Sequence, residues 1–272
     1  MSTDISENNI PENQIAANDI PETSSPATES GKSPHERPLG ARLGEGFFCI
    51  VYLIYVAVLI YIMNGKYMAA NTAEDMINVY RFGMGVLMAS LLVGGDAFHL
   101  IPRIIIDFRG SLPKQELLLG LGSLISFITM TIFYNILITM GDSVEYSESM
   151  YNLFIEQAIL VLTFIRIIIL ILPQNRWFSR EPNRKWAIRR NVPFIIIGIL
   201  TVAGLINVMH HATHYPAGFY ITIMVTVILS FIFYFPVAIW GKEKPKTGML
   251  MIPKTICYMV MLSVITFYTV IM

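Results

Sequence analysis

Long apolar runs alternate with short polar segments from about Phe47 to the end of the chain. Seven of these runs reach about 18 or more residues, the length that an α-helix needs to cross the hydrocarbon core of a bilayer. The pattern therefore predicts an all-α polytopic membrane protein, a bundle of seven transmembrane helices. We place the spans at residues 46–64, 80–101, 117–140, 152–172, 192–210, 217–240 and 252–271.

The beginning of the chain has a different composition. Residues 1–44 are rich in Pro, Ser, Asn, Thr and Glu and contain too few apolar residues for a packed core. We expect a disordered polar N-terminal tail over 1–44 and a seven-helix transmembrane domain over 45–272. A polar start is not typical of a cleavable signal peptide, so the first span is expected to act as the targeting signal.

Composition agrees with a membrane location. Charged residues make up 14% of the chain and hydrophobic residues 54%, whereas soluble domains contain about 25% charged residues. The lipid bilayer is thus the expected partner. The formal net charge is zero, so no basic surface suggests nucleic acid. Cys49 and Cys257 lie near the starts of spans, and a disulfide framework is not expected.

Basic residues predict the orientation of the chain. The loops after spans 2, 4 and 6 are rich in Lys and Arg, whereas residues 141–150 contain acidic residues and neither Lys nor Arg. Because basic loops stay on the cytoplasmic side, we expect a multi-pass protein of the cell membrane with its N-terminus in the cytoplasm and its C-terminus outside.

Span 2 carries an unusual polar group near its cytoplasmic end. Asp96, His99 and Arg103 are spaced three and four residues apart, so they share one helix face. Arg166 in span 4 lies at a similar depth and could pair with Asp96. The pair could simply lock spans 2 and 4 together. Alternatively, Asp96 and His99 form a proton relay, a ligand contact or metal ligands. In a third interpretation Arg103 extends to the interface and the polar interior has neither role.

Pro102 adds a second feature to this segment. Proline has no N–H group, so the carbonyl oxygen of Phe98 is left free for another donor.

Histidines gather at the end of span 5. His210 and His214 have the i, i+4 spacing that lets two imidazoles bind one metal ion from a helix. Glu156 in span 4 lies at a comparable depth and is the candidate third ligand for zinc. The other interpretations are a hydrated helix cap and a pH-sensing contact.

The string from Gly95 to Arg103, GDAFHLIPR, resembles a motif of an uncharacterised family of bacterial multi-pass membrane proteins. The resemblance implies a seven-helix membrane protein and no particular activity. The chain is also similar, through His99 and the pair His210 and His214, to the alkaline ceramidase and progestin-receptor-like superfamily of seven-span zinc proteins. That superfamily carries its paired histidines on the last span, on the same side as the span 2 histidine. Here the pair closes span 5, on the opposite side.

Three functional hypotheses follow. The first is a small transporter, sensor or assembly component with a polar interior on spans 2, 4 and 5. The alternative is a membrane-embedded zinc-dependent lipid hydrolase, distantly like alkaline ceramidases, in which a metal-bound water is the nucleophile. The third is a structural membrane protein with no small-molecule site.

Overall fold

The computed structural model of the protein describes residues 39–109, 114–145, 150–178, 183–240 and 245–268. Most of the predicted disordered tail, residues 1–38, lies outside these ranges. The described residues form seven long α-helices and two short 3-10 helices. Their bounds are α1 Leu39–Thr72, α2 Met76–Arg109, α3 Gln115–Glu145, α4 Met150–Ile171, η2 Pro173–Asn175, α5 Arg184–His211, α6 Ala217–Trp240, η3 Pro245–Leu250 and α7 Met251–Phe267.

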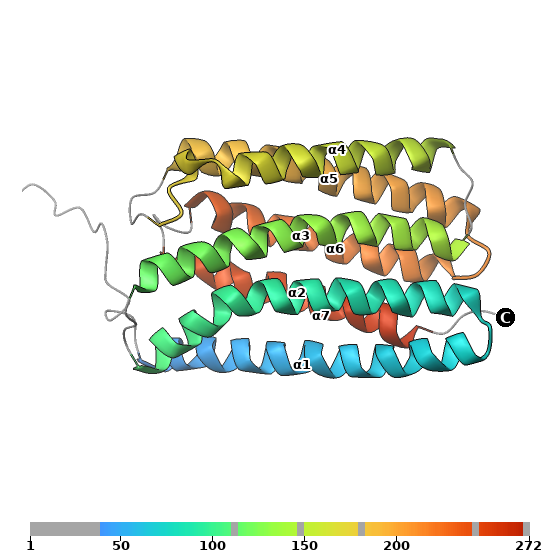
Figure 1. Cartoon of the computed structure of the whole chain (residues 1–272), viewed down its shortest axis with the longest axis horizontal. Helices are drawn as coiled ribbons and strands as arrows, with labels where there is room; N and C mark the ends of the chain where they lie inside the picture. Colours follow the sequence, from blue (N-terminus) through green and yellow to red (C-terminus); the bar gives the residue numbers. More distant parts are fainter. Residues whose placement is uncertain (1–38, 110–113, 146–149, 179–182, 241–244, 269–272) are drawn as a thin grey trace, which may run out of the picture. The chain divides into compact units, whose positions relative to one another are not determined.

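All seven α-helices are long and apolar enough to cross a membrane, so the predicted all-α, seven-span architecture is confirmed. Successive helices run in opposite directions (Figure 1). We call the end of the bundle where α1 begins the N-terminal end, and the end where α7 finishes the C-terminal end.

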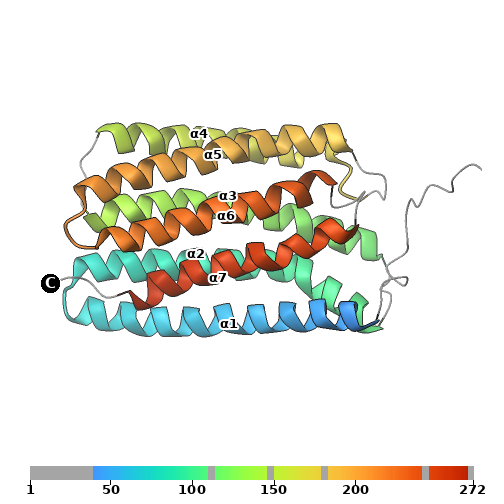
Figure 2. The same ribbon diagram turned by 180° about the vertical axis from the view of Figure 1, so that it is seen from behind.

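The helices pack mainly against their neighbours in sequence. The closest pairs are α1 with α2, α2 with α3, α4 with α5 and α6 with α7, while α7 also returns to contact α1 and α2. Figures 1 and 2 show α1 at one edge of this arrangement and α4 with α5 at the other. Helix α3 lies between them and contacts α2, α4 and α5, so its side chains reach most of the interior.

Large apolar side chains point outward as well as inward. Tyr61, Phe154 and Phe164 are all well exposed, although each would be buried in a soluble protein. A bilayer supplies the apolar surroundings that such residues require, because lipid tails replace water around the helices. Polar groups are accordingly placed inside the bundle, and these interior polar groups define the candidate site.

Several helices begin or end beyond the predicted spans because their ends are fixed by distant polar contacts. Helix α1 begins at Leu39, before the predicted start of span 1 at residue 46. Arg42 in this added turn is buried, and its Nη2 donates to the carbonyl oxygens of Ile106 and Asp107 at 3.0 and 2.9 Å. These carbonyls belong to the last turn of α2, where helical acceptors have no internal donor.

Candidate functional site

A carboxylate inside the N-terminal half of the bundle is held by two hydroxyl groups. Asp96 Oδ2 accepts a hydrogen bond from the Tyr52 hydroxyl at 2.9 Å, and Oδ1 accepts one from Ser126 Oγ at 2.5 Å. Three helices, α1, α2 and α3, therefore meet at this side chain. Together with His99 and Ser123 these residues form what we call the Asp96 cluster.

His99 lies one turn beyond Asp96 on the same helix. Its Nδ1 is 3.1 Å from Ser123 Oγ. The Ser123 hydroxyl donates its own proton to the Leu119 carbonyl oxygen at 2.7 Å. The imidazole must therefore donate from Nδ1, which fixes the position of one ring proton.

The carbonyl oxygen freed by Pro102 lies directly against α3. A Cβ atom built on Gly122 would lie 2.3 Å from the Phe98 oxygen and 2.7 Å from the His99 Cα. Only glycine permits this approach, in which a Cα–H group of α3 faces the unpaired carbonyl. Helix α3 thus makes its close contact with α2 at the point where Pro102 interrupts the backbone hydrogen bonds of α2.

The predicted pair between Asp96 and Arg166 is not formed. Asp96 is satisfied by hydroxyl groups, and Arg103 pairs instead with Glu45 of α1, Nη2 to Oε2 at 2.5 Å. The prediction was wrong because depth along a helix does not specify which face of the bundle the side chain reaches. Asp96 lies among α1, α2 and α3, whereas Arg166 lies beside α5.

Arg166 is fully buried. Its guanidinium Cζ lies 3.5 Å from the centroid of the Phe194 ring. None of its three nitrogen atoms has a hydrogen-bond partner among the described residues. The Tyr234 hydroxyl oxygen lies close to Arg166 and makes a polar contact with it. No Arg166 nitrogen meets it with the distance and angle of a hydrogen bond, and the hydroxyl donates its own proton to Asn191 Oδ1 at 2.8 Å.

A second buried cation lies near Arg166. Lys254 of α7 is 4% exposed, and its Nζ lies 4.9 Å from the Tyr234 ring centroid and 5.4 Å from that of Tyr258. The Phe194 and Tyr234 rings are themselves in edge contact, with centroids 5.4 Å apart. We call these five residues, Arg166, Phe194, Tyr234, Lys254 and Tyr258, the Arg166 centre.

Amide and acidic side chains continue the polar interior towards the C-terminal end. Asn152 of α4 donates to Asp142 of α3 at 2.8 Å and accepts from Asn207 of α5 at 3.1 Å. Deeper in the bundle, Asn135 donates to Thr163 at 2.6 Å. We call these five residues the amide cluster, and it joins α3, α4 and α5.

Glu156 lies between the two levels of the amide cluster. Its side chain interacts with the Thr139 hydroxyl, and its Oε1 is buried without a hydrogen-bond partner among the described residues. The acidic side chain of Asp142 is close enough to repel it electrostatically. Glu156 therefore belongs to the polar interior and not to a group of histidines.

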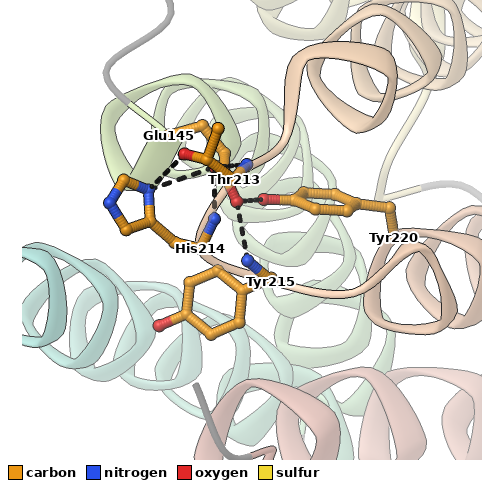
Figure 3. A network of polar contacts seen from close by, with 5 residues as sticks. All are labelled: Glu145, Thr213, His214, Tyr215 and Tyr220. Carbon is orange, nitrogen blue, oxygen red and sulfur yellow. Dashed lines mark hydrogen bonds and ion pairs between the residues drawn. The ribbon is translucent and has the colours of Figure 1, made fainter. Parts of the chain in front are cut away.

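Glu145, the last residue of α3, binds the loop between α5 and α6 (Figure 3). Its Oε2 accepts from the backbone N–H groups of Thr213 and His214 at 2.7 and 3.0 Å. Its Oε1 accepts from the backbone N–H of Tyr215 at 3.1 Å and from the Tyr220 hydroxyl at 2.6 Å. His214 Nδ1 lies 3.2 Å from Oε2. These five residues are the Glu145 network.

The carboxyl group of Glu145 has a lowered pKa. Burial favours the neutral form and acts to raise the pKa, but the hydrogen bonds from Tyr220, His214 and Thr213 stabilise the carboxylate and outweigh burial. Three successive backbone donors around one carboxylate are a typical anion-binding arrangement. This carboxylate therefore fixes the loop as an anion.

The predicted zinc ligands do not come together. His214 is held by Glu145, His210 is exposed, and Glu156 faces Thr139 and Asp142. His211 Nδ1 bonds the Asn207 carbonyl oxygen at 2.8 Å. The described part of the chain contains no group of three or more His, Cys, Asp or Glu side chains that could hold a metal ion. The i, i+4 spacing failed as a predictor because α5 ends at His211 and the chain then turns away.

Three important residues were not singled out from sequence. Arg81 is 1% exposed and binds the end of α7, although its place just inside span 2 was a usable signal. Lys254 stands near the start of the span predicted at 252–271, where a basic residue is ordinary, yet it lies inside the bundle. Glu145 stands in a loop segment that attracted notice only for its lack of basic residues.

The chain matches no protein-family model, no curated protein and no solved structure. Its resemblance to a family of bacterial membrane proteins remains a prediction. The chain is a multi-pass membrane protein with seven apolar helices and a polar interior.

Proposed function

We propose that the protein is a transporter or sensor for a small solute, which it binds among the polar side chains inside the bundle. The observation that carries this proposal is the succession of the Asp96 cluster, the Arg166 centre and the amide cluster along the helices. From Ser123 to Asp142, the polar residues of α3 span roughly 28 Å at about 1.5 Å per residue, which approaches the roughly 30 Å of a bilayer core.

Ionisable residues inside membrane helices are costly unless they have a function or a partner. An Asp96–Arg166 pair would have explained both charges structurally, and it is not formed. The interior also extends beyond the predicted spans 2, 4 and 5. Helix α3 contributes to the Asp96 cluster and the amide cluster, and α7 contributes Lys254.

A ligand screen followed by uptake tests the proposal. The purified protein in detergent is melted with panels of small anions, cations and neutral solutes, and each solute that raises the melting temperature is then tested for uptake into proteoliposomes. We expect at least one class to bind, and uptake or binding to change at least about tenfold in Asp96→Asn, since charge at this depth acts strongly on a bound solute. Loss of the carboxylate should weaken the binding of a cation and strengthen that of an anion. Glu74→Gln, an exposed position in the α1–α2 turn, is the matched control.

Two results would contradict the proposal. The first is that no solute of any charge class binds or crosses. The second is that the response of Asp96→Asn equals that of the wild type and of Glu74→Gln.

We further propose that the N-terminus lies in the cytoplasm, since the loops at the N-terminal end of the bundle are the basic ones. Glu74 and Lys114 are exposed and belong to opposite ends of the bundle. In intact cells, an impermeant maleimide should label Glu74→Cys, and should label Lys114→Cys only after permeabilisation. The reverse pattern would invert the orientation.

A further inference from the structure

The structure assigns a small-anion site to the centre of the bundle, with the Arg166 guanidinium as the binding group and Lys254 as a supporting cation. The ligand class is a monovalent anion of few atoms, such as chloride, nitrate or formate. This inference rests on the proposed function in one respect, namely that the interior accepts a solute.

The first argument is the state of the Arg166 side chain. It is 0% exposed, and its Nε, Nη1 and Nη2 all lack a hydrogen-bond acceptor among the described residues. A guanidinium carries five N–H donors in one plane. The Phe194 ring covers one face of that plane at 3.5 Å, and a ring face cannot satisfy donors that point outward from the edge. The edge is where a planar oxyanion binds with two parallel bonds.

The second argument is the charge around Arg166. Two other cations, Lys254 and Arg190, lie close enough to Arg166 to interact with it electrostatically. Asp96 attracts Lys254, but its carboxylate oxygens are already bonded to Tyr52 and Ser126. Cations therefore outnumber carboxylates at the centre, and a bound anion would offset this excess in surroundings that screen charge poorly.

The third argument concerns the size of the ligand. The side chains that surround the centre are packed: Phe194 is 1% exposed, Tyr134 is 0% exposed, and a Cβ on Gly198 would meet the Phe231 ring at 2.4 Å. Bulky organic anions would require these rings to move, whereas an ion of one to four heavy atoms displaces far fewer side-chain atoms.

Thermal melts at constant ionic strength test the inference. The full chain in detergent is compared in sodium chloride, sodium nitrate, sodium formate and sodium gluconate, the last being too large for the site. We expect at least one small anion to raise the melting temperature in a saturable way. In Arg166→Met we expect binding to weaken at least about tenfold, since the bidentate pair is lost. Lys114→Gln, an exposed position, should respond as the wild type does.

Lys254→Met serves as the second variant if Arg166→Met fails to fold, and it should weaken the same anion response. Equal melting temperatures in all four salts, or an undiminished response in the variant that folds, would overturn the inference. Arg166-dependent anion binding without flux or any change of conformation would overturn the proposed function and leave the site. Solute uptake without anion binding would do the reverse.

Discussion

Arg81 and Arg166 are the most deeply buried arginines among the described residues, at 1% and 0% exposed, and their surroundings are opposite. Arg81, near the C-terminal end of the bundle, donates from Nε to the Ile265 carbonyl oxygen at 2.7 Å and from Nη1 to the Tyr215 hydroxyl at 3.0 Å. It also binds the Tyr268 carbonyl oxygen through Nη2. Arg166, at the centre, has no hydrogen-bond acceptor among the described residues.

The difference follows from the helices around each arginine. The last turn of an α-helix leaves carbonyl oxygens without internal donors and carries a partial negative charge. Arg81 meets the end of α7 and satisfies those oxygens, and Lys66 binds the Thr266 oxygen there at 2.7 Å. Arg166 meets the middles of helices, where carbonyl oxygens ordinarily accept from N–H groups of the same helix. The same side chain is therefore structural in one place and available to a ligand in the other.

The largest expected effect on stability comes from the replacement of Arg81 by Met. The substitution removes four hydrogen bonds made by a charged group, the longest of them to Asn78 Oδ1 at 3.5 Å, and leaves buried oxygen atoms without donors. We expect a loss of roughly 3–5 kcal/mol of stability, measured as a fall in melting temperature in detergent. A variant as stable as the wild type would show that Arg81 is not the structural member of the comparison.

Replacement of Glu145 by Gln tests the contacts that position Tyr215, a hydrogen-bond partner of Arg81. The Glu145 network holds the backbone of Tyr215, whose hydroxyl accepts from Arg81. At pH 7 we expect Glu145→Gln to be less stable by roughly 2 kcal/mol, because one anionic oxygen becomes an amide donor facing other donors.

The stability difference between the wild type and Glu145→Gln should depend on pH. The lowered pKa of Glu145 means that its stabilisation is fully present above the pKa of the unfolded chain and is lost as the pH falls through the folded value. The stability difference between wild type and Glu145→Gln should therefore shrink in melts on the acidic side of that window. A constant difference down to pH 3 would contradict the assigned role of the carboxylate.

Replacement of Arg166 by Met should change stability in the opposite direction to Arg81→Met. In gluconate, with no small anion present, we expect Arg166→Met to equal the wild type or exceed it by roughly 1 kcal/mol, since an uncompensated buried charge is removed. Destabilisation as large as that of Arg81→Met would mean that Arg166 is structural after all.

The smallest expected effect is at His210. This side chain is exposed and is not part of the Glu145 network. We expect His210→Ala to change stability by less than about 0.5 kcal/mol, and metal content to be the same as in the wild type. A bound metal ion lost in this variant would restore the zinc interpretation.

The architecture of the protein could be predicted from its sequence, since the length and apolar character of a span are local properties that do not depend on tertiary contacts. The contents of the site could be predicted only in part. Asp96, His99 and Arg166 attract attention as charges inside spans, but their contacts depend on how the helices rotate against each other. Local spacing even misled at His210 and His214, where the end of α5 separates residues that a continuous helix would align.

The Glu145 network has a consequence for how the loop between α5 and α6 tolerates substitution. Glu145 binds the main chain of Thr213, His214 and Tyr215, so it requires an N–H group at each position. The side chains of Thr213 and His214 add longer contacts to Oε2, at 3.4 and 3.2 Å. Most residues could therefore replace Thr213 or His214 at a small cost, because the shorter main-chain bonds remain. Proline could not, because it removes the donor. In a deep substitution scan, this loop should tolerate most residues at 213 and 214, while position 145 accepts few replacements.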